Sequence, residues 1–206
     1  MSFSTYSADG PGSVVVCYFH WRMAADKGHT LTPPAGPRDH TKGPADAPVT
    51  LVEYGDYECP HCGMAYPIVK EVQRRLGKHL RFVFRNFPIP DSHPHAVHAA
   101  EAAEAAAAQG HFWPMHDMLY ERQRKLLDRH LAEYAKAVGL DGEQFQREMA
   151  AHVHAARVQE DVTSGIESGV RGTPTFFING VKYTESWDAD TLTAALETAT
   201  GRRQRK

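Results

Sequence analysis

The apolar residues of this chain gather in short runs, which polar and turn-forming residues separate. Residues 48–57 and 80–87 are rich in β-branched and aromatic side chains, a composition typical of buried strands. Residues 59–76 lie between the two runs and are predicted to form a helix that Gly77 ends and Pro67 kinks. The first half of the chain therefore predicts a β-α-β unit.

The pattern becomes helical between residues 93 and 165. Residues 99–108 are eight alanines and two glutamates, a composition of strong helix propensity. Further helices are predicted at 113–127, 129–138, 142–150 and 152–168. The apolar side chains of 113–127 are expected to form a core rather than the rim of a peptide groove, and the basic side chains Arg122, Arg124, Lys125 and Arg129 are expected to be solvated.

Strand character returns near the end of the chain. Residues 175–178 and 181–183 read as short strands, and the Asn179-Gly180 pair between them is a strong hairpin signal because both turn residues need a positive φ. A last helix is predicted at 189–199. The order is β-α-β, a helical block, then β-β-α, which predicts an α/β fold with one sheet and an all-helical insertion.

This order divides the chain into four parts. Residues 39–92 and 166–200 should form the sheet-containing domain, and 93–165 the helical insertion. Residues 1–38 are rich in glycine and proline and read as an N-terminal arm, with a short strand at 13–19 and no assigned role. Residues 201–206 form a basic tail, expected to be a solvated end.

Composition excludes several classes of function. The chain has 206 residues, 42% of them hydrophobic, and a net charge of −2, so no overall basic field points to nucleic acid. No apolar run approaches the ~18 residues of a membrane-spanning helix, so no membrane insertion is expected. The N-terminus shows no signal-peptide pattern, which predicts a cytoplasmic protein, or a periplasmic or extracytoplasmic one if the start codon is misassigned.

The chain has three cysteines, Cys17, Cys59 and Cys62, which are too few for a disulfide-stapled scaffold. Cys59 and Cys62 enclose Pro60-His61 where a strand meets a helix N-terminus. Unpaired backbone N–H groups and the helix dipole favour a thiolate on Cys59 there, and His61 can lower its pKa further. Cys59 is therefore the candidate nucleophile in thiol–disulfide exchange.

Cys62 lies one helical turn further on and is expected to be buried, so that it would resolve a mixed disulfide on Cys59. Its thiol then needs a proton acceptor. Glu53 is the favoured candidate because a carboxylate on an apolar strand is costly to bury unless it is used. Two alternatives stay open: an outward-facing Glu53, and Asp56 as the acceptor.

A second hypothesis belongs to a different class of function. Cys59 and Cys62 could ligate a metal together with His93, His95 and His98, the tightest of the histidine groups. The protein would then be a non-catalytic metal-binding or interaction module. The sequence favours the redox interpretation because there is no second pair of closely spaced cysteines.

The motifs together resemble one family. Cys59-Pro60-His61-Cys62 after an apolar strand, with Gly172-Thr173-Pro174-Thr175 far downstream, is similar to the DsbA-like thiol:disulfide oxidoreductases of the thioredoxin superfamily. The resemblance covers residues 39–199. The opening of this segment, 43–49, is similar to a branch whose domains also occur fused to sodium/proton antiporters.

The resemblance implies a thioredoxin fold with an inserted helical domain. It implies a cis peptide at Thr173-Pro174 beside the cysteine pair, a substrate main chain that pairs with Thr173, and a buried-acid role for Glu53. It also implies that no metal or other cofactor is needed, because the Cys59–Cys62 disulfide is the redox centre.

The predicted function is that of a protein disulfide oxidoreductase. Its partners would be cysteine-containing protein substrates, with glutathione or a recycling redox protein as further partners, and no nucleic acid. Well-studied DsbA-like oxidants are exported, whereas this chain shows no signal peptide. In a reducing compartment the same pair could act as a reductase or isomerase.

Overall fold

The computed structural model describes residues 30–201, so the predicted strand at 13–19, Cys17 and the tail from 202 lie outside the described residues. The strands are β1 (His40–Lys42), β2 (Val49–Gly55), β3 (Leu80–Asn86), β4 (Thr175–Ile178) and β5 (Val181–Tyr183). The α-helices are α1 (Pro60–Leu76), α2 (Ala96–Ala108), α3 (Phe112–Glu121), α4 (Asp128–Ala137), α5 (Gly142–Ala150), α6 (Ala155–Glu167) and α7 (Ala189–Ala199), and a short 3-10 turn (Gly77–His79) follows α1.

The five strands form one mixed sheet in the order β1-β3-β2-β4-β5. β2 and β3 are parallel, as a β-α-β unit requires, and β4 pairs antiparallel with both β2 and β5. Asn179 and Gly180 have φ values of 49° and 81°, which confirms the predicted hairpin turn. The α/β architecture is therefore the predicted one.

The first strand of the sheet was not predicted. β1 contains only His40, Thr41 and Lys42 and pairs antiparallel with Phe82–Phe84 of β3. It is short, polar and mostly exposed, so it lacks the apolar alternation on which a strand prediction rests. Such short charged edges are common because they discourage pairing with other chains.

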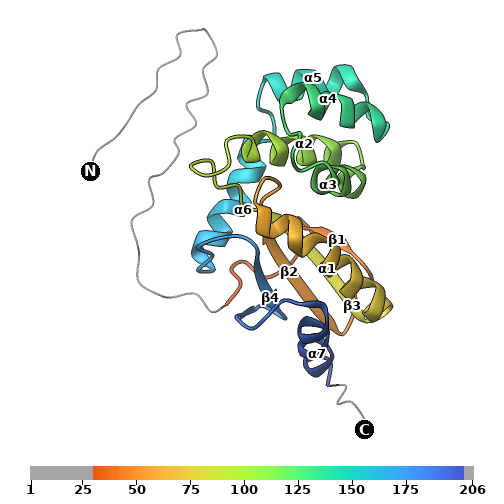
Figure 1. The fold of residues 1–206 in the computed structure, drawn as a ribbon, viewed down its shortest axis with the longest axis vertical. Coiled ribbons are helices and arrows are strands. Elements are labelled where there is room, and N and C mark those ends of the chain that lie inside the picture. The colour runs from red at the N-terminus through yellow and green to blue at the C-terminus, as the bar shows by residue number, and fades with distance from the viewer. Residues whose placement is uncertain (1–29, 202–206) are drawn as a thin grey trace, which may run out of the picture.

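Helices cover both faces of the sheet (Figure 1). The same face of β2 and β3 packs against α1 and α7, in one cluster that includes Leu51, Phe82, Val72 and Leu192. The other face packs a smaller cluster, with Val162 of α6 against it. The domain boundary predicted at 165/166 therefore lies inside α6, because helical periodicity cannot tell which layer a helix covers.

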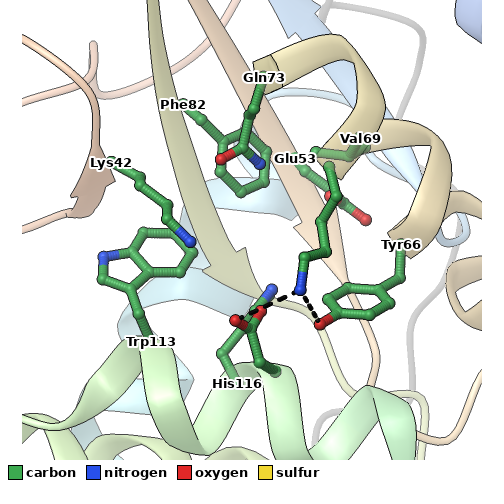
Figure 2. A pocket seen from close by; sticks show the side chains of 10 residues that line it. Lys42, Glu53, Tyr66, Val69, Gln73, Phe82, Trp113 and His116 are labelled. Atoms are coloured by element: carbon green, nitrogen blue, oxygen red, sulfur yellow. Dashed lines mark hydrogen bonds and ion pairs between the residues drawn. The ribbon is translucent and has the colours of Figure 1, made fainter. Parts of the chain in front are cut away.

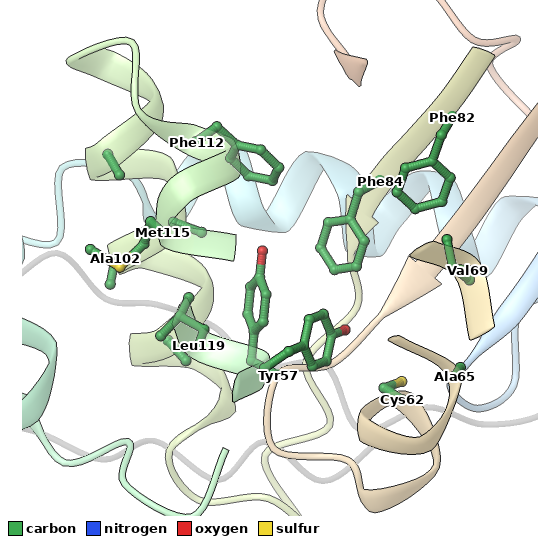
Figure 3. Close-up of a cluster of buried hydrophobic side chains, with 14 of the residues drawn as sticks. Tyr57, Cys62, Ala65, Val69, Phe82, Phe84, Ala102, Phe112, Met115 and Leu119 are labelled. Atoms are coloured by element: carbon green, nitrogen blue, oxygen red, sulfur yellow. The ribbon is translucent and has the colours of Figure 1, made fainter. Parts of the chain in front are cut away.

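Helices α2 to α5 stack at one end of the sheet (Figure 1). They share the hydrophobic core of the α1 face rather than forming a separate one. Figure 3 shows Phe112, Met115 and Leu119 of α3 on one side of this core and Phe84 of β3 on the other. The core role predicted for 113–127 is confirmed for Met115 and Leu119, which are fully buried.

The described end of the predicted arm is attached to the sheet. Leu31 is buried and its N–H donates to the carbonyl of Gly180 at 2.8 Å. Arg85 of β3, fully buried, donates to the Asp39 carboxylate from Nε at 2.8 Å and from Nη2 at 3.0 Å. Its guanidinium also donates to the carbonyls of Pro33 and Pro34, so residues 30–39 are held against the second face of the sheet.

This ion pair predicts that removing Arg85 greatly lowers stability and that a second substitution, at Asp39, restores part of it. Arg85→Met leaves the Asp39 carboxylate buried without its partner, so the free energy of unfolding should fall by about 3–5 kcal/mol. Adding Asp39→Asn removes the orphaned charge and should recover more than half of the loss. Urea unfolding of the three proteins measures this, and equal losses for the single and double variants would contradict it.

Candidate active site

The site begins where β2 ends and α1 starts. Cys59 is the N-cap residue of α1, with φ −67° and ψ 121°, and Pro60 occupies the first helical position. The cap residue's own side chain makes no capping hydrogen bond. Asp56 supplies one instead, since its Oδ1 accepts from the N–H groups of Glu58 at 2.8 Å and Cys59 at 3.2 Å.

The other oxygen of Asp56 is also occupied. Oδ2 accepts from the N–H of Ile89 at 2.9 Å and lies 2.7 Å from Nδ1 of His93. Both carboxylate oxygens of Asp56 are thus engaged in fixing the loop before Cys59. This arrangement makes Asp56 a positioning residue and leaves it no oxygen free for the cysteine pair, against the alternative in which it is the proton acceptor.

Cys59 is a free thiol, 4% exposed, whose Sγ lies 3.3 Å from the carbonyl oxygen of Thr173. A hydrogen bond from the Cys62 thiol is the largest influence on its pKa, which falls to about 4. The Thr173 side chain and the backbone N–H groups of Cys62 and His61 lower the pKa further, against the opposing effect of burial. The site therefore holds a thiolate at neutral pH.

His61 contributes through its main chain. Its side chain is exposed, and within residues 30–201 its ring makes no hydrogen bond or ion pair. Its backbone N–H is one of the groups that lower the pKa of Cys59. A contribution from the charge of the ring stays a prediction.

Cys62 lies in the opposite environment, three residues further along α1. It is fully buried, and its Sγ accepts a long hydrogen bond of 3.5 Å from the N–H of Asp56. Burial raises the pKa of the Cys62 thiol well above its ordinary value, and the negative charge of Glu53 raises it further. The two cysteines thus have separate protonation states: Cys59 is the thiolate and Cys62 the thiol.

Glu53 is buried in the centre of the sheet, so the alternative of an outward-facing side chain is wrong. It is 2% exposed, lies on β2 between β3 and β4, and its Oε1 has no hydrogen-bond partner among the described residues. Burial alone raises the pKa of its carboxyl to about 8. A group with that pKa can accept and release a proton near neutral pH.

Glu53 also lines a narrow cavity with a volume of about 10 Å³, room for about one water molecule. Figure 2 shows the cavity, with Glu53 and Val69 on one side and Lys42 and Trp113 on the other. At its rim the Nζ of Lys70 donates to the hydroxyl of Tyr66 at 2.8 Å. The carboxyl group is therefore close to a polar opening although it is itself buried.

Thr173 and Pro174 complete the site from the far end of the chain. The peptide bond between them is cis, as the family resemblance implied. β4 begins at the next residue, Thr175, which pairs with Tyr54 of β2. This pairing brings the Thr173 carbonyl to Cys59 although 114 residues separate the two positions.

The histidine group does not come together as a ligand set. His93 pairs with Asp56, His95 with Glu58 and His98 with Asp128. Across residues 30–201 no group of three or more His, Cys, Asp or Glu side chains could hold a metal ion. The metal-binding hypothesis gains no support from these contacts.

One contact at the site has no signal in the sequence. Gln123, in the loop after α3, donates from Nε2 to the carbonyl oxygen of Cys59 at 2.8 Å. A Cβ at Gly63 would collide with the Gln123 side-chain amide, so the glycine makes room for this contact. The helical block is thereby tied directly to the reactive residue.

Residues 36–198 match the thioredoxin family, so the chain belongs to that family. Among solved structures, a thioredoxin-like oxidoreductase from Silicibacter pomeroyi is 30% identical, with a TM-score of 0.71 over 81% of this chain and 94% of that one. BdbD from Bacillus subtilis, in oxidised form, has a TM-score of 0.75 at 24% identity, over 84% of this chain and 99% of that one. The chain has the predicted thioredoxin fold, which these solved structures share.

The curated relatives are antiporters. The chain is 46% identical over 162 residues to the Na(+)/H(+) antiporter NhaA 1 of Salinispora arenicola, and 43% identical over 174 residues to the Na(+)/H(+) antiporter NhaA of Herminiimonas arsenicoxydans. These matches cover 79% and 84% of this chain but 25% and 28% of the antiporters. The chain thus spans about a quarter of their length. None of its helices between residues 30 and 201 is long and apolar enough to cross a membrane.

The Cys59 thiolate predicts a titration in the reduced protein. Its ultraviolet absorbance should appear with a midpoint near pH 4, and Cys59→Ser should abolish it. Because the folded pKa lies below the ordinary value of 9.0, the thiolate stabilises the fold fully above pH 9 and this stabilisation is lost as the pH falls to about 4. A midpoint above pH 7 would contradict the assigned environment.

Glu53 predicts a pH dependence of opposite sign. Its folded pKa of about 8 exceeds the ordinary 4.5, so its contribution to stability is fully present below pH 4.5 and is lost as the pH rises to about 8. Glu53→Gln removes this loss. The free energy of unfolding of the variant, relative to that of the wild type, should therefore increase by up to about 5 kcal/mol as the pH rises across that range. Urea unfolding of the oxidised proteins at several pH values measures this difference, since Cys59 and Cys62 do not titrate when they form a disulfide. A stability difference independent of pH would contradict a buried neutral carboxyl.

Proposed function

We propose that the protein is a thiol:disulfide oxidoreductase that exchanges a Cys59–Cys62 disulfide with the thiols of protein substrates. The observation that carries the proposal is the pairing of a thiolate on Cys59 with a buried thiol on Cys62 in one turn of α1. In the oxidising direction a substrate thiolate attacks Sγ of Cys59, forms a mixed disulfide and releases Cys62. A second substrate thiolate then displaces Cys59, so one substrate disulfide forms and the protein gains two thiol groups.

Glu53 is proposed to move the proton that Cys62 gains or loses. When Cys62 leaves in the oxidising direction it takes a proton from the Glu53 carboxyl group. In the reverse direction Cys62 gives its proton to the Glu53 carboxylate and attacks the mixed disulfide on Cys59. A carboxyl with a pKa of about 8 can serve both directions.

The electrostatics favour donation of disulfides. A stable Cys59 thiolate stabilises the reduced protein, which makes the disulfide form the stronger oxidant. The redox poise of the compartment then sets the direction: glutathione in a reducing compartment would hold the pair reduced, and the protein would act as a reductase or isomerase there.

The proposed substrates are cysteine-containing polypeptides in an extended conformation. Residues 171–173, before Pro174, lie outside the strands, and an extended substrate chain is proposed to pair with them by backbone hydrogen bonds. The similarity to the antiporters covers only about a quarter of their length, and that quarter is the segment with the cysteine pair. We therefore propose no ion transport for this chain.

Two cysteine variants test the proposal with a reduced, unfolded protein as substrate. The oxidised wild type should introduce disulfides into it. Cys59→Ser should introduce none, because the attacked sulfur is missing. Cys62→Ser can be treated so that Cys59 carries a disulfide with a small thiol. This variant should react once with the substrate and then accumulate as mixed disulfides between Cys59 and the substrate.

Equilibration of the pair with glutathione buffers gives the reduction potential that decides between donor and reductase. Purified wild type and Cys59→Ser should also be assayed for metal. Failure of the wild type to form the intramolecular disulfide, together with stoichiometric metal, would overturn the proposal in favour of the metal-binding module.

A further inference from the structure

Tyr120 of α3 is a buried phenol whose hydroxyl has no hydrogen-bond partner among residues 30–201. Its ring is fixed by other rings: Tyr66 stacks on it at 5.2 Å between centroids, Tyr57 lies at 4.9 Å and His116 at 5.1 Å. The side chain is 6% exposed, so water does not satisfy the hydroxyl freely. A buried hydroxyl without a partner destabilises a fold, which raises the question of what the oxygen is for.

The geometry of β2 places this oxygen between Glu53 and the residue that contacts Cys62. A Cβ at Gly55 would lie 2.7 Å from the hydroxyl oxygen of Tyr120, so the phenol sits directly over the Gly55 backbone. Glu53 is two residues earlier on the same strand and therefore faces the same side of the sheet. The N–H of Asp56, the residue after Gly55, is the one that contacts Sγ of Cys62.

Neither of these two groups has a close donor among residues 30–201. Oε1 of Glu53 has no partner in the described part of the chain, and Cys62 has only the long contact from a backbone N–H. Two polar groups nearby are engaged elsewhere: the hydroxyl of Tyr57 lies 3.1 Å from Nδ1 of His116, and both oxygens of Asp56 are occupied. The Tyr120 hydroxyl is a buried donor on this side of the sheet that has no partner among the described residues.

We propose that Tyr120 is a positioning residue for the proton transfer between Cys62 and Glu53, whose hydroxyl donates a hydrogen bond to the negative charge that passes between them. The inference rests on the proposed function. In the resolving step Glu53 carries the charge first, takes the proton of Cys62, and leaves the charge on the Cys62 sulfur. That sulfur then bonds to Cys59 and the substrate thiolate leaves.

The phenol keeps its proton throughout. Burial raises the pKa of Tyr120 well above its ordinary value, and the negative charges of Cys62 and Glu53 raise it further. Tyr120 therefore acts only as a donor, and it does not compete with Glu53 for the proton.

Tyr120→Phe tests this because it removes one oxygen and keeps the ring. The probe is oxidised glutathione: the Cys59 thiolate of reduced protein attacks it and releases one glutathione, and Cys62 then resolves the mixed disulfide and releases a second. Acid quenching and mass spectrometry follow both steps in a single turnover. We expect the resolving step to slow about tenfold, which corresponds to about 1.4 kcal/mol, with the first step unchanged.

Two further readouts separate this role from a structural one. The pH midpoint of the resolving step should rise in Tyr120→Phe, because the charged forms lose a donor, while the free energy of unfolding should stay equal or increase. The effects of Tyr120→Phe and Glu53→Gln should be less than additive in the double variant, since both act on one proton transfer.

Tyr57→Phe is the matched control. It removes a buried hydroxyl that is bonded to His116, so it should lower stability and leave the resolving rate unchanged. A wild-type resolving rate in Tyr120→Phe, or an equal slowing of both steps, would overturn the inference while leaving the proposed function intact. A wild type that does not react with oxidised glutathione would instead overturn the proposed function.

Discussion

The antiparallel pairing of β2 with β4 is the contact on which the site depends. β2 carries Glu53 and leads directly into the loop to Cys59. β4 follows the helical block and begins immediately after Pro174. Only when Tyr54 lies opposite Thr175 does the Thr173 carbonyl reach Cys59. A shift of the register by one residue would turn Glu53 away from α1 and separate the two halves of the site.

The difference between the two cysteines follows from one turn of helix. The first turn leaves backbone N–H groups unpaired at Cys59, where they stabilise a thiolate, whereas Cys62 lies below the surface against the centre of the sheet. Each cysteine reinforces the state of the other, because the thiol of Cys62 donates to the thiolate of Cys59. The second proton therefore needs a separate acceptor, and among residues 30–201 Glu53 is the buried carboxylate with an oxygen left without a partner.

Sequence reasoning reached the parts of the molecule that local patterns encode. The apolar strands, the hairpin at Asn179 and the cysteine motif can be read within a few residues, and the placement of Glu53 follows from a charge on an apolar strand. The ion pair between Arg85 and Asp39 could not be predicted, because its partners are 46 positions apart and neither belongs to a periodic pattern. The same holds for Gln123 at the Cys59 carbonyl, since a single polar contact across the fold leaves no local signal.

The helical block therefore contributes to the chemistry as well as to the core. α3 carries Tyr120, and the loop that follows α3 carries Gln123, so one segment of the insertion contacts the Cys59 carbonyl and lies over Gly55 of β2. α2 permits this close approach because most of its buried residues are alanines, which let α3 pack tightly against it. The glycines at 55 and 63 complete the fit, since a side chain at either would displace a residue of the block. The small residues on both sides thus set the distance at which the inserted helices meet the redox pair.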